Sequence, residues 1–324
     1  MKTTRRTLLA GSAAMLAAPA LAQTAWPERN LRIIVPLSAG GIADIMARLV
    51  AEALQQRLGR GVVVENRTGA GGAIGMEAVA RAAPDGYTLG MGNIAANAIL
   101  PAMMRGRLPY DPVTDFQQVC LVGLTPSVLV VNPQRVPVQS LPEFLAFLRA
   151  NPDRLNFGSS GVGTSLHLTM EMLMQETGAR MTHVPFRGSS DMITALVGGQ
   201  VDLAVDGFAT AWPHVQAGRL RAIAVPTADP LPFAPELPTI ASLVPAVQVS
   251  PWHGIMGPAG MPAAAVQRLN AEIASFLRQP DTVEKLRGFG AIAAPNTPEE
   301  FRALMVSERD KFQALITRTG ISAG

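Results

Sequence analysis

Short apolar runs alternate along the chain with segments of helical periodicity. The first run, 31–36, is followed by a turn and by a segment, 42–58, whose apolar residues recur on one helical face. Gly59 follows at once, as expected just past a helix end. Further strands are predicted at 62–65 and 87–90, each leading into a helix. This alternation is typical of a parallel sheet covered by helices.

The same order of elements recurs in the middle of the chain. Strands are predicted at 155–158, 181–184 and 201–205, and each is followed by a loop and a helical segment. The two halves share a layout rather than a sequence. We therefore expect two α/β modules of similar architecture, with a cleft formed between their loops.

Two apolar strands are expected to link the modules, 128–131 leading out and 220–225 leading back. A proline-rich passage, a strand at 252–256 and two C-terminal helices complete the chain. The second of these helices begins at a capping box that starts with Thr297. Two crossings imply a hinge that lets the cleft close. The predicted α/β fold has domain 1 at 23–125 and 226–324, and domain 2 at 126–225.

The N-terminus has the pattern of an export signal. A basic start is followed by an apolar stretch, 8–18, and by small residues at 20–22. The apolar stretch is shorter than the ~20 residues that a membrane-spanning helix needs. We expect residues 1–22 to be a cleaved signal peptide and the mature protein to be periplasmic. The pair Arg5 and Arg6 resembles a twin-arginine signal, and a general secretory signal is the alternative.

Charge and cysteine content narrow the function classes. The chain has 27 Lys and Arg and 24 Asp and Glu. Three of the basic residues lie in the predicted signal, so 27 − 3 = 24 remain and the mature chain is neutral. It lacks the basic surface expected of a nucleic-acid-binding protein. The single cysteine, Cys120, cannot form an internal disulfide, and its apolar neighbours predict a buried strand.

Two loops, one in each module, carry small and hydroxyl residues at the start of a helix. The first loop covers residues 38–44 and the second loop covers residues 159–165. Unpaired N–H groups and the helix dipole make such positions favourable for a carboxylate. The alternative is that glycine and serine only permit tight turns. Two loops in equivalent positions favour binding.

Segments in the same order along nearly the whole predicted mature chain resemble those of the Bug family, the extracytoplasmic receptors of tripartite tricarboxylate transporters. They include WPERNLRIIVPLSAGGIAD, VVVENRTGAGGAIG, APDGYTLGMGN, LPYDPVTDF, LNFGSSGVGTSLHL, HVPFRGSS and LVGGQVDLAVD. The resemblance implies a two-domain periplasmic-binding-protein fold of the type II-like, Venus-flytrap kind. It also implies that one ligand carboxylate lies between the first and second loops.

The first loop departs from the family pattern. Leu37 stands where the family has an aromatic residue, Ala39 where it has proline, and Ala43 where it has a hydroxyl residue. Capture by the backbone of Gly40 and Gly41 should survive these changes. The side-chain contacts and one wall of the cleft are altered, so a relative's ligand is not simply transferable. The second loop keeps its hydroxyl residues.

The predicted ligand-binding residues are Leu37, Ser38, Ala39, Gly40, Gly41, Ile42, Ala43 and Asp44 in the first loop, Ser159, Ser160, Gly161, Thr164 and Ser165 in the second, and Asn93, Arg187, Asp206 and Phe208 in other loops. Asp44 is expected to cap the first helical turn or to bond across the closed cleft, and the two roles are compatible. Asp206 either orients loops or ligand, or is an ordinary turn aspartate. Arg187 either meets a second carboxylate or is an exposed loop arginine. Asn93 and Phe208 are expected to influence selectivity.

The predicted function is reversible capture of a small mono- or dicarboxylate and its delivery to the membrane subunits of a transporter, with a membrane sensor as the alternative partner. An exported hydrolase is the other class considered. Ser160 and Ser165 lack the serine elbow motif, and the four histidines are scattered along the sequence. We therefore expect no catalytic residue, no metal and no cofactor. A monomer is the default expectation for this architecture.

Overall fold

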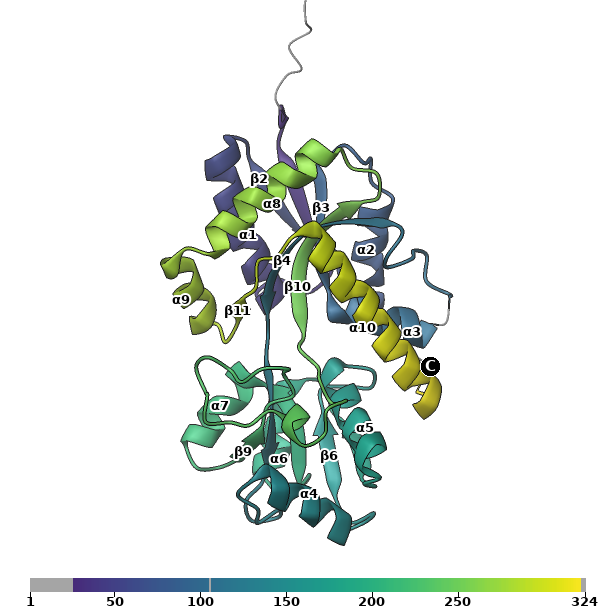
Figure 1. Ribbon diagram of the computed structural model, residues 1–324, viewed down its shortest axis with the longest axis vertical. Coiled ribbons are helices and arrows are strands. Elements are labelled where there is room, and N and C mark those ends of the chain that lie inside the picture. Colours follow the sequence, from purple (N-terminus) through teal and green to yellow (C-terminus); the bar gives the residue numbers. More distant parts are fainter. Residues whose placement is uncertain (1–25, 105, 322–324) are drawn as a thin grey trace, which may run out of the picture.

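The structure is a computed structural model that describes residues 26–104 and 106–321. It forms two lobes, each built on one sheet with helices packed around it (Figure 1). The predicted signal peptide, 1–22, lies outside the described residues. Among the residues described, no helix combines the length and apolar character needed to cross a membrane.

Lobe 1 contains a six-stranded sheet in the order β11-β4-β10-β3-β1-β2. The strands β1, β2 and β3 are parallel, whereas β10 runs antiparallel to both β3 and β4. The strands are β1 Leu31–Val35, β2 Val62–Asn66, β3 Thr88–Asn93, β4 Phe116–Leu124, β10 Trp252–Pro258 and β11 Ile292–Ala293. The helices are α1 Ile42–Leu58, α2 Ala73–Ala80, α3 Leu100–Met104, α8 Ala263–Leu277, α9 Pro280–Gly288 and α10 Pro298–Thr319, with short helices η1 Ala70–Gly72 and η2 Ala95–Ile99.

Lobe 2 contains a five-stranded sheet in the order β7-β6-β8-β5-β9. The strands are β5 Ser127–Val131, β6 Asn156–Ser159, β7 Thr182–Pro185, β8 Leu203–Gly207 and β9 Arg221–Ala224. The helices are α4 Leu141–Ala150, α5 Ser165–Thr177, α6 Ser189–Val197 and α7 Phe208–Gln216, with a short helix η3 Ile240–Ser242. The loops β6–α5, β7–α6 and β8–α7 follow the carboxyl ends of their strands, where an α/β sheet places its binding residues.

The chain crosses between the lobes at two adjacent points. The first crossing joins β4 to β5, and the second enters β10; Thr125 N donates to Pro251 O at 2.8 Å and ties them together. The predicted linking strands, 128–131 and 220–225, instead lie inside the lobe 2 sheet as β5 and β9. Each exchanges ladder hydrogen bonds with its neighbours there, so neither is available as a hinge strand.

The proline-rich segment 226–250 packs on lobe 2. Its backbone pairs with the end of β9, with Ile240 N donating to Val225 O at 2.8 Å and Val249 N to Pro226 O at 2.7 Å. Its apolar residues share a cluster with lobe 2 strands and helices. We therefore place the second boundary of lobe 2 at the Pro251 crossing, not at the position expected from the sequence.

The C-terminal helix α10 reaches from lobe 1 to lobe 2. Figure 1 shows it running diagonally from the lobe 1 sheet toward α5. Arg318 Nη1 lies 3.4 Å from Glu176 Oε1 of α5, and Lys311 Nζ donates to Gln248 O at 2.8 Å. Three helices, rather than the predicted two, follow β10, because α9 forms a separate helix between α8 and α10.

Candidate ligand-binding site

The first loop is organised by the buried carboxylate of Asp44. Its Oδ2 accepts hydrogen bonds from Gly40 N at 3.0 Å and Arg48 Nε at 2.9 Å, and its Oδ1 accepts one from Asn66 Nδ2 at 3.0 Å. Asn66 also donates to Leu37 O, which fixes the start of the loop. Asp44 therefore holds the loop in shape through Gly40, which precedes the N-cap residue Gly41.

The pKa of the Asp44 carboxyl lies below its ordinary value. The main cause is the hydrogen bond from Arg48, and the Gly40 N–H and the Asn66 amide act in the same direction, against the effect of burial. Asp44 is consequently ionised at neutral pH. The anionic charge of the first loop is thus already paired within lobe 1.

The start of α1 is open. Its N-cap residue is Gly41, which has no side chain that could cap the helix, and both Gly40 and Gly41 are exposed. A helix of 17 residues such as α1 carries partial positive charge at this end and has unpaired first-turn N–H groups. The residues Ser38 and Ala39 are exposed beside it, whereas Ala43 is buried. The backbone is the available anion-binding group here.

The second loop is built around Thr164, which caps α5. Its Oγ1 accepts from His167 N at 3.2 Å and donates to Gly161 O at 2.9 Å. Its hydroxyl is therefore committed within the loop. Among the described residues, the hydroxyls of Ser160 and Ser165 have no hydrogen-bond partner, and both side chains are half-buried. These two hydroxyls, rather than that of Thr164, are available to a ligand.

Two histidines form a stacked pair beneath the second loop. The ring centroids of His167 and His183 are 3.9 Å apart, and Phe157 stacks on His183 at 4.8 Å. Gly163 N donates to His167 Nδ1 at 3.1 Å, while Ser159 Oγ lies 2.6 Å from His183 Nε2. Burial, and then the neighbouring His167, lower the pKa of His183 to about 4. A neutral His183 stacked on His167 thus supports the loop. Two of the histidines that look scattered in the sequence meet here.

Two of the predicted selectivity residues are buried within their own lobes. Asn93 Oδ1 accepts from Ala96 N at 3.0 Å at the start of η2. Phe208 packs between Trp212 and Phe233, with ring centroids at 4.6 Å and 5.0 Å. Asn93 Nδ2 has no partner among the described residues, and Phe208 lines a cavity of about 310 Å³ that also contacts Arg287 and Gly290. The expected influence of these two residues on selectivity stays a prediction.

Asp206 and Arg187 differ sharply in environment. Asp206, at the end of β8, is fully buried; its Oδ1 accepts from Ser189 Oγ at 2.7 Å, and its Oδ2 has no partner among the described residues. Burial raises its pKa to about 6. Arg187 is exposed and forms no ion pair within the described part of the chain. The structure therefore leaves Arg187 free for a partner or for solvent.

Two cavities are relevant to the site. One, here called the seam cavity, has a volume of about 270 Å³ and lies between the lobes. It is lined by Gly71, Ala95, Ile99, Leu100 and Met103 of lobe 1 and by Val162, Gly163 and Thr164 of the second loop. The seam is tight at Gly163, where an added Cβ would lie 2.5 Å from Met103 Cε. Among the described residues, no hydrogen bond joins the first loop to the second loop.

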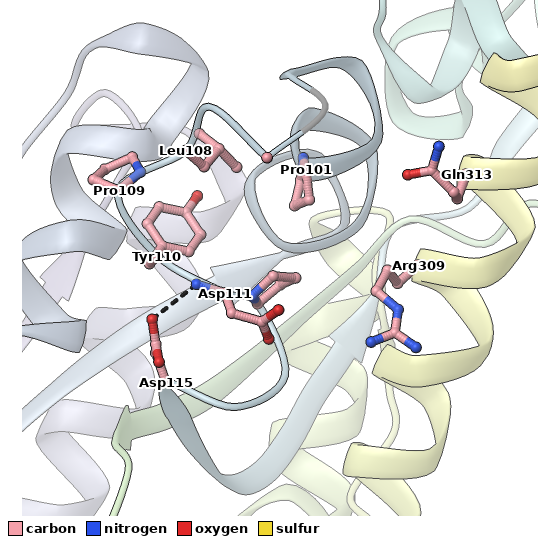
Figure 2. Close-up of a pocket in the computed structure, with 10 residues that line it drawn as sticks. Pro101, Leu108, Pro109, Tyr110, Asp111, Asp115, Arg309 and Gln313 are labelled. Carbon is pink, nitrogen blue, oxygen red and sulfur yellow. Dashed lines mark hydrogen bonds between the residues drawn. The ribbon is translucent and has the colours of Figure 1, made fainter.

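The other cavity has a volume of about 470 Å³ and is formed by the LPYDPVTDF segment and α10 (Figure 2). Figure 2 shows Asp111 on the side that faces Arg309 of α10, with Asp115 on the far side of Asp111 and Gln313 further along the helix. Asp111 N donates to Asp115 Oδ2 at 2.8 Å, so these groups stabilise their own turn. All its lining residues belong to lobe 1, so movement of the lobes does not enclose it.

Comparison with known proteins gives a consistent result. The family described as the tripartite tricarboxylate transporter family receptor, TctC, matches residues 46–321. A UPF0065 protein from the tcbD-tcbE intergenic region of Pseudomonas sp. is 37% identical, covering 98% of this chain and 96% of that protein. Protein BugT of Bordetella pertussis is 35% identical, covering 94% of this chain and 93% of BugT.

Solved structures agree in fold. An R. palustris protein solved with adipate has a TM-score of 0.76 at 33% identity, covering 92% of this chain and 99% of its own. MatC from Rhodopseudomonas palustris, solved with bound malate, has a TM-score of 0.72 at 31% identity, covering 90% of this chain and 100% of its own. By family match, relatives and fold, this chain belongs to the tripartite tricarboxylate transporter receptor family, the periplasmic solute-binding proteins of the TctC and Bug type.

Proposed function

We propose that this protein captures a small carboxylate between its two lobes and presents it to the membrane subunits of a tripartite tricarboxylate-type transporter. The proposal includes export to the periplasm with removal of residues 1–22. The observation that supports it best is the pair of helix starts, one per lobe, that leave anion-binding groups open. At α1 these are the first-turn N–H groups that follow Gly41, because the N–H groups of Gly40 and Gly41 already donate to Asp44 Oδ2 and Ser38 O. At α5 they include the hydroxyl of Ser165.

Relatives that carry carboxylates support the same ligand chemistry. The adipate-bound and malate-bound proteins share the fold of this chain at 33% and 31% identity. A carboxylate held by several N–H and hydroxyl donors needs no lysine or arginine, because charge-assisted hydrogen bonds are strong. Affinity in the micromolar range corresponds to about 8 kcal/mol, which a small number of such bonds can supply.

Reversible binding, with no reaction of the ligand, is compatible with the serine–histidine contact described at the second loop. Ser159 Oγ lies 2.6 Å from His183 Nε2, a distance suited to a nucleophile and its base. Ser159 is nevertheless fully buried, and its Oγ also bonds with Gly161. A hydroxyl that no substrate can reach supports the loop instead of attacking a ligand.

The proposal predicts that Ser165→Ala weakens binding at least tenfold, because one charge-assisted hydrogen bond is lost. Calorimetry of the mature protein with acetate, hexanoate, benzoate, malate and adipate would identify the tightest of these ligands for comparison. Ser307→Ala, an exposed serine on α10, is the matched control and should bind normally. Unchanged affinity in Ser165→Ala would remove the second loop from the site, and silence across the panel would overturn carboxylate capture.

A further inference from the structure

The seam cavity differs in chemistry from the helix starts beside it. Its side chains from lobe 1 are aliphatic or thioether groups, including those of Ile99, Leu100 and Met103. Lobe 2 contributes Val162, whose side chain is 56% exposed although it faces a lobe interface. Of the described residues that line the cavity, none carries a charged side chain. A second ligand charge placed there would lose water without gaining a protein partner.

The polar capacity of the cavity is already used. Thr164 supplies the only polar side chain among the residues that line it. Its hydroxyl is committed on both sides, as donor to Gly161 O and as acceptor from His167 N. A carboxylate on a ligand would therefore find no side-chain donor in the cavity, because the only hydroxyl proton there is already given to Gly161 O. An apolar group would lose nothing and would cover exposed apolar surface.

The cavity is continuous with the start of α5. Gly163 and Thr164 line it, and Ser165 is the first residue of the helix. A carboxylate that bonds to the Ser165 hydroxyl and the first-turn N–H groups would therefore have the cavity next to it. The remainder of the ligand can extend between the lobes, over Val162 on one side and Leu100 on the other. A volume of about 270 Å³ lies near the lower end of the usual range for ligand pockets, which suits a short chain or one ring.

We propose that the seam cavity receives the apolar tail of the ligand, so that this receptor prefers a monocarboxylate with an aliphatic or small aromatic tail to a dicarboxylate of the same length. This rests on the proposed capture of a carboxylate.

Hexanoate and adipate provide a direct test, since both have six carbons in a line and differ by the second carboxylate. Calorimetry should give a hexanoate affinity at least tenfold higher than that of adipate. Across acetate, butyrate and hexanoate, each added methylene should raise the affinity about fourfold, the effect of burying one such group. An adipate affinity equal to or above that of hexanoate, or no dependence on chain length, would overturn the proposal.

Substitution of two equally exposed valines distinguishes an effect at the seam cavity from the effect of placing a charge elsewhere on the surface. Val162 is 56% exposed at the cavity, and Val63 is 57% exposed on β2. Val162→Asp should weaken hexanoate binding at least tenfold, because it places an anionic charge beside the tail, whereas Val63→Asp should bind normally. Both sites are exposed, so neither variant threatens folding. Normal hexanoate binding by Val162→Asp would remove Val162 from the site.

The two proposals fail in different ways. If malate or adipate binds and hexanoate does not, carboxylate capture stands and the assignment of the seam cavity is wrong. If no mono- or dicarboxylate binds to the correctly folded protein, both are wrong. Hexanoate binding that depends on Ser165 and on Val162 together would support both, with the carboxylate and tail placed at opposite ends of one site.

Discussion

Replacing Asp44 with alanine is expected to lower the free energy of unfolding by about 3 kcal/mol at neutral pH and to weaken ligand binding at least tenfold. The alanine leaves Gly40 N without its acceptor, removes one of the two acceptors of Asn66 Nδ2 and removes the partner of Arg48. Three hydrogen bonds to an ionised carboxylate are lost together, and each contributes more than a bond between neutral groups. The Gly40–Gly41 backbone would lose its orientation, and with it the open start of α1.

Asp202 is the matched control for Asp44. It is also a buried carboxylate with an arginine and a backbone donor, Arg135 Nε at 2.9 Å and Asn156 N at 2.8 Å. It directly precedes β8 and bonds to the first residue of β6, at the opposite end of the lobe 2 sheet from the second loop. Asp202→Ala should destabilise by a similar amount and bind ligand normally. Equal loss of affinity in both variants would contradict a specific role for the first loop.

The contribution of Asp44 to stability should depend on pH in a defined direction. Its pKa is lowered in the folded protein, so the contribution is complete above the ordinary aspartate pKa of about 3.9 and is lost as the pH falls through the lowered value. Denaturation of the native protein and of Asp44→Ala at pH 7 and at pH 3 would measure it. The difference between the two should shrink at the lower pH.

Replacing Asp206 with asparagine is expected to have the opposite effect, raising the free energy of unfolding by about 2 kcal/mol at pH 8. Burial raises the pKa of Asp206 from 3.8 to about 6, so ionising it costs the folded protein up to about 3 kcal/mol. This destabilisation is absent below pH 3.8, grows as the pH rises to about 6, and is constant above that. Asparagine keeps the oxygen that accepts from Ser189 and carries no charge.

Urea denaturation at pH 8 and pH 3.5 would test this prediction. The gain in the free energy of unfolding from Asp206→Asn should appear at pH 8 and nearly vanish at pH 3.5. At pH 3.5 the Asp206 carboxyl of the unsubstituted protein is largely protonated in both the folded and the unfolded state. Asp202→Asn should lose stability at pH 8, because Arg135 loses its anionic partner. A gain of the same size at both pH values would show that burial of charge at Asp206 is not the cause.

Elements were predictable from the sequence where periodicity and capping agree. The segment 42–58 was expected to be helical and is α1, ending before Gly59 in the left-handed conformation with φ of 66°. The capping box at Thr297 is present, with Thr297 Oγ1 accepting from Glu300 N at 3.2 Å. A similar signal at Ser140 and Glu143 begins α4, which was not predicted although the pattern is present in the sequence.

The candidate site could be located from the sequence only at the level of loops. Which hydroxyls are open depends on contacts that local patterns do not specify: Thr164 is committed, whereas Ser165 is not. His167 and His183 meet because β7 pairs with β6, whose carboxyl end leads through the second loop into α5, and Phe157 of β6 stacks against both rings. Such contacts depend on the order of strands in the sheet, which hydrophobic periodicity leaves open.

The path of the chain has a consequence for how the protein folds. Lobe 2 is one continuous stretch whose two ends meet at Thr125 and Pro251, so it can complete its core as soon as that stretch has been synthesised. Lobe 1 cannot, because β10 is inserted between β3 and β4 in the middle of its sheet. Until 252–258 emerge, β3 and β4 present unpaired edges, the condition that favours association with other chains. The lobe that begins the chain is therefore the last to be finished.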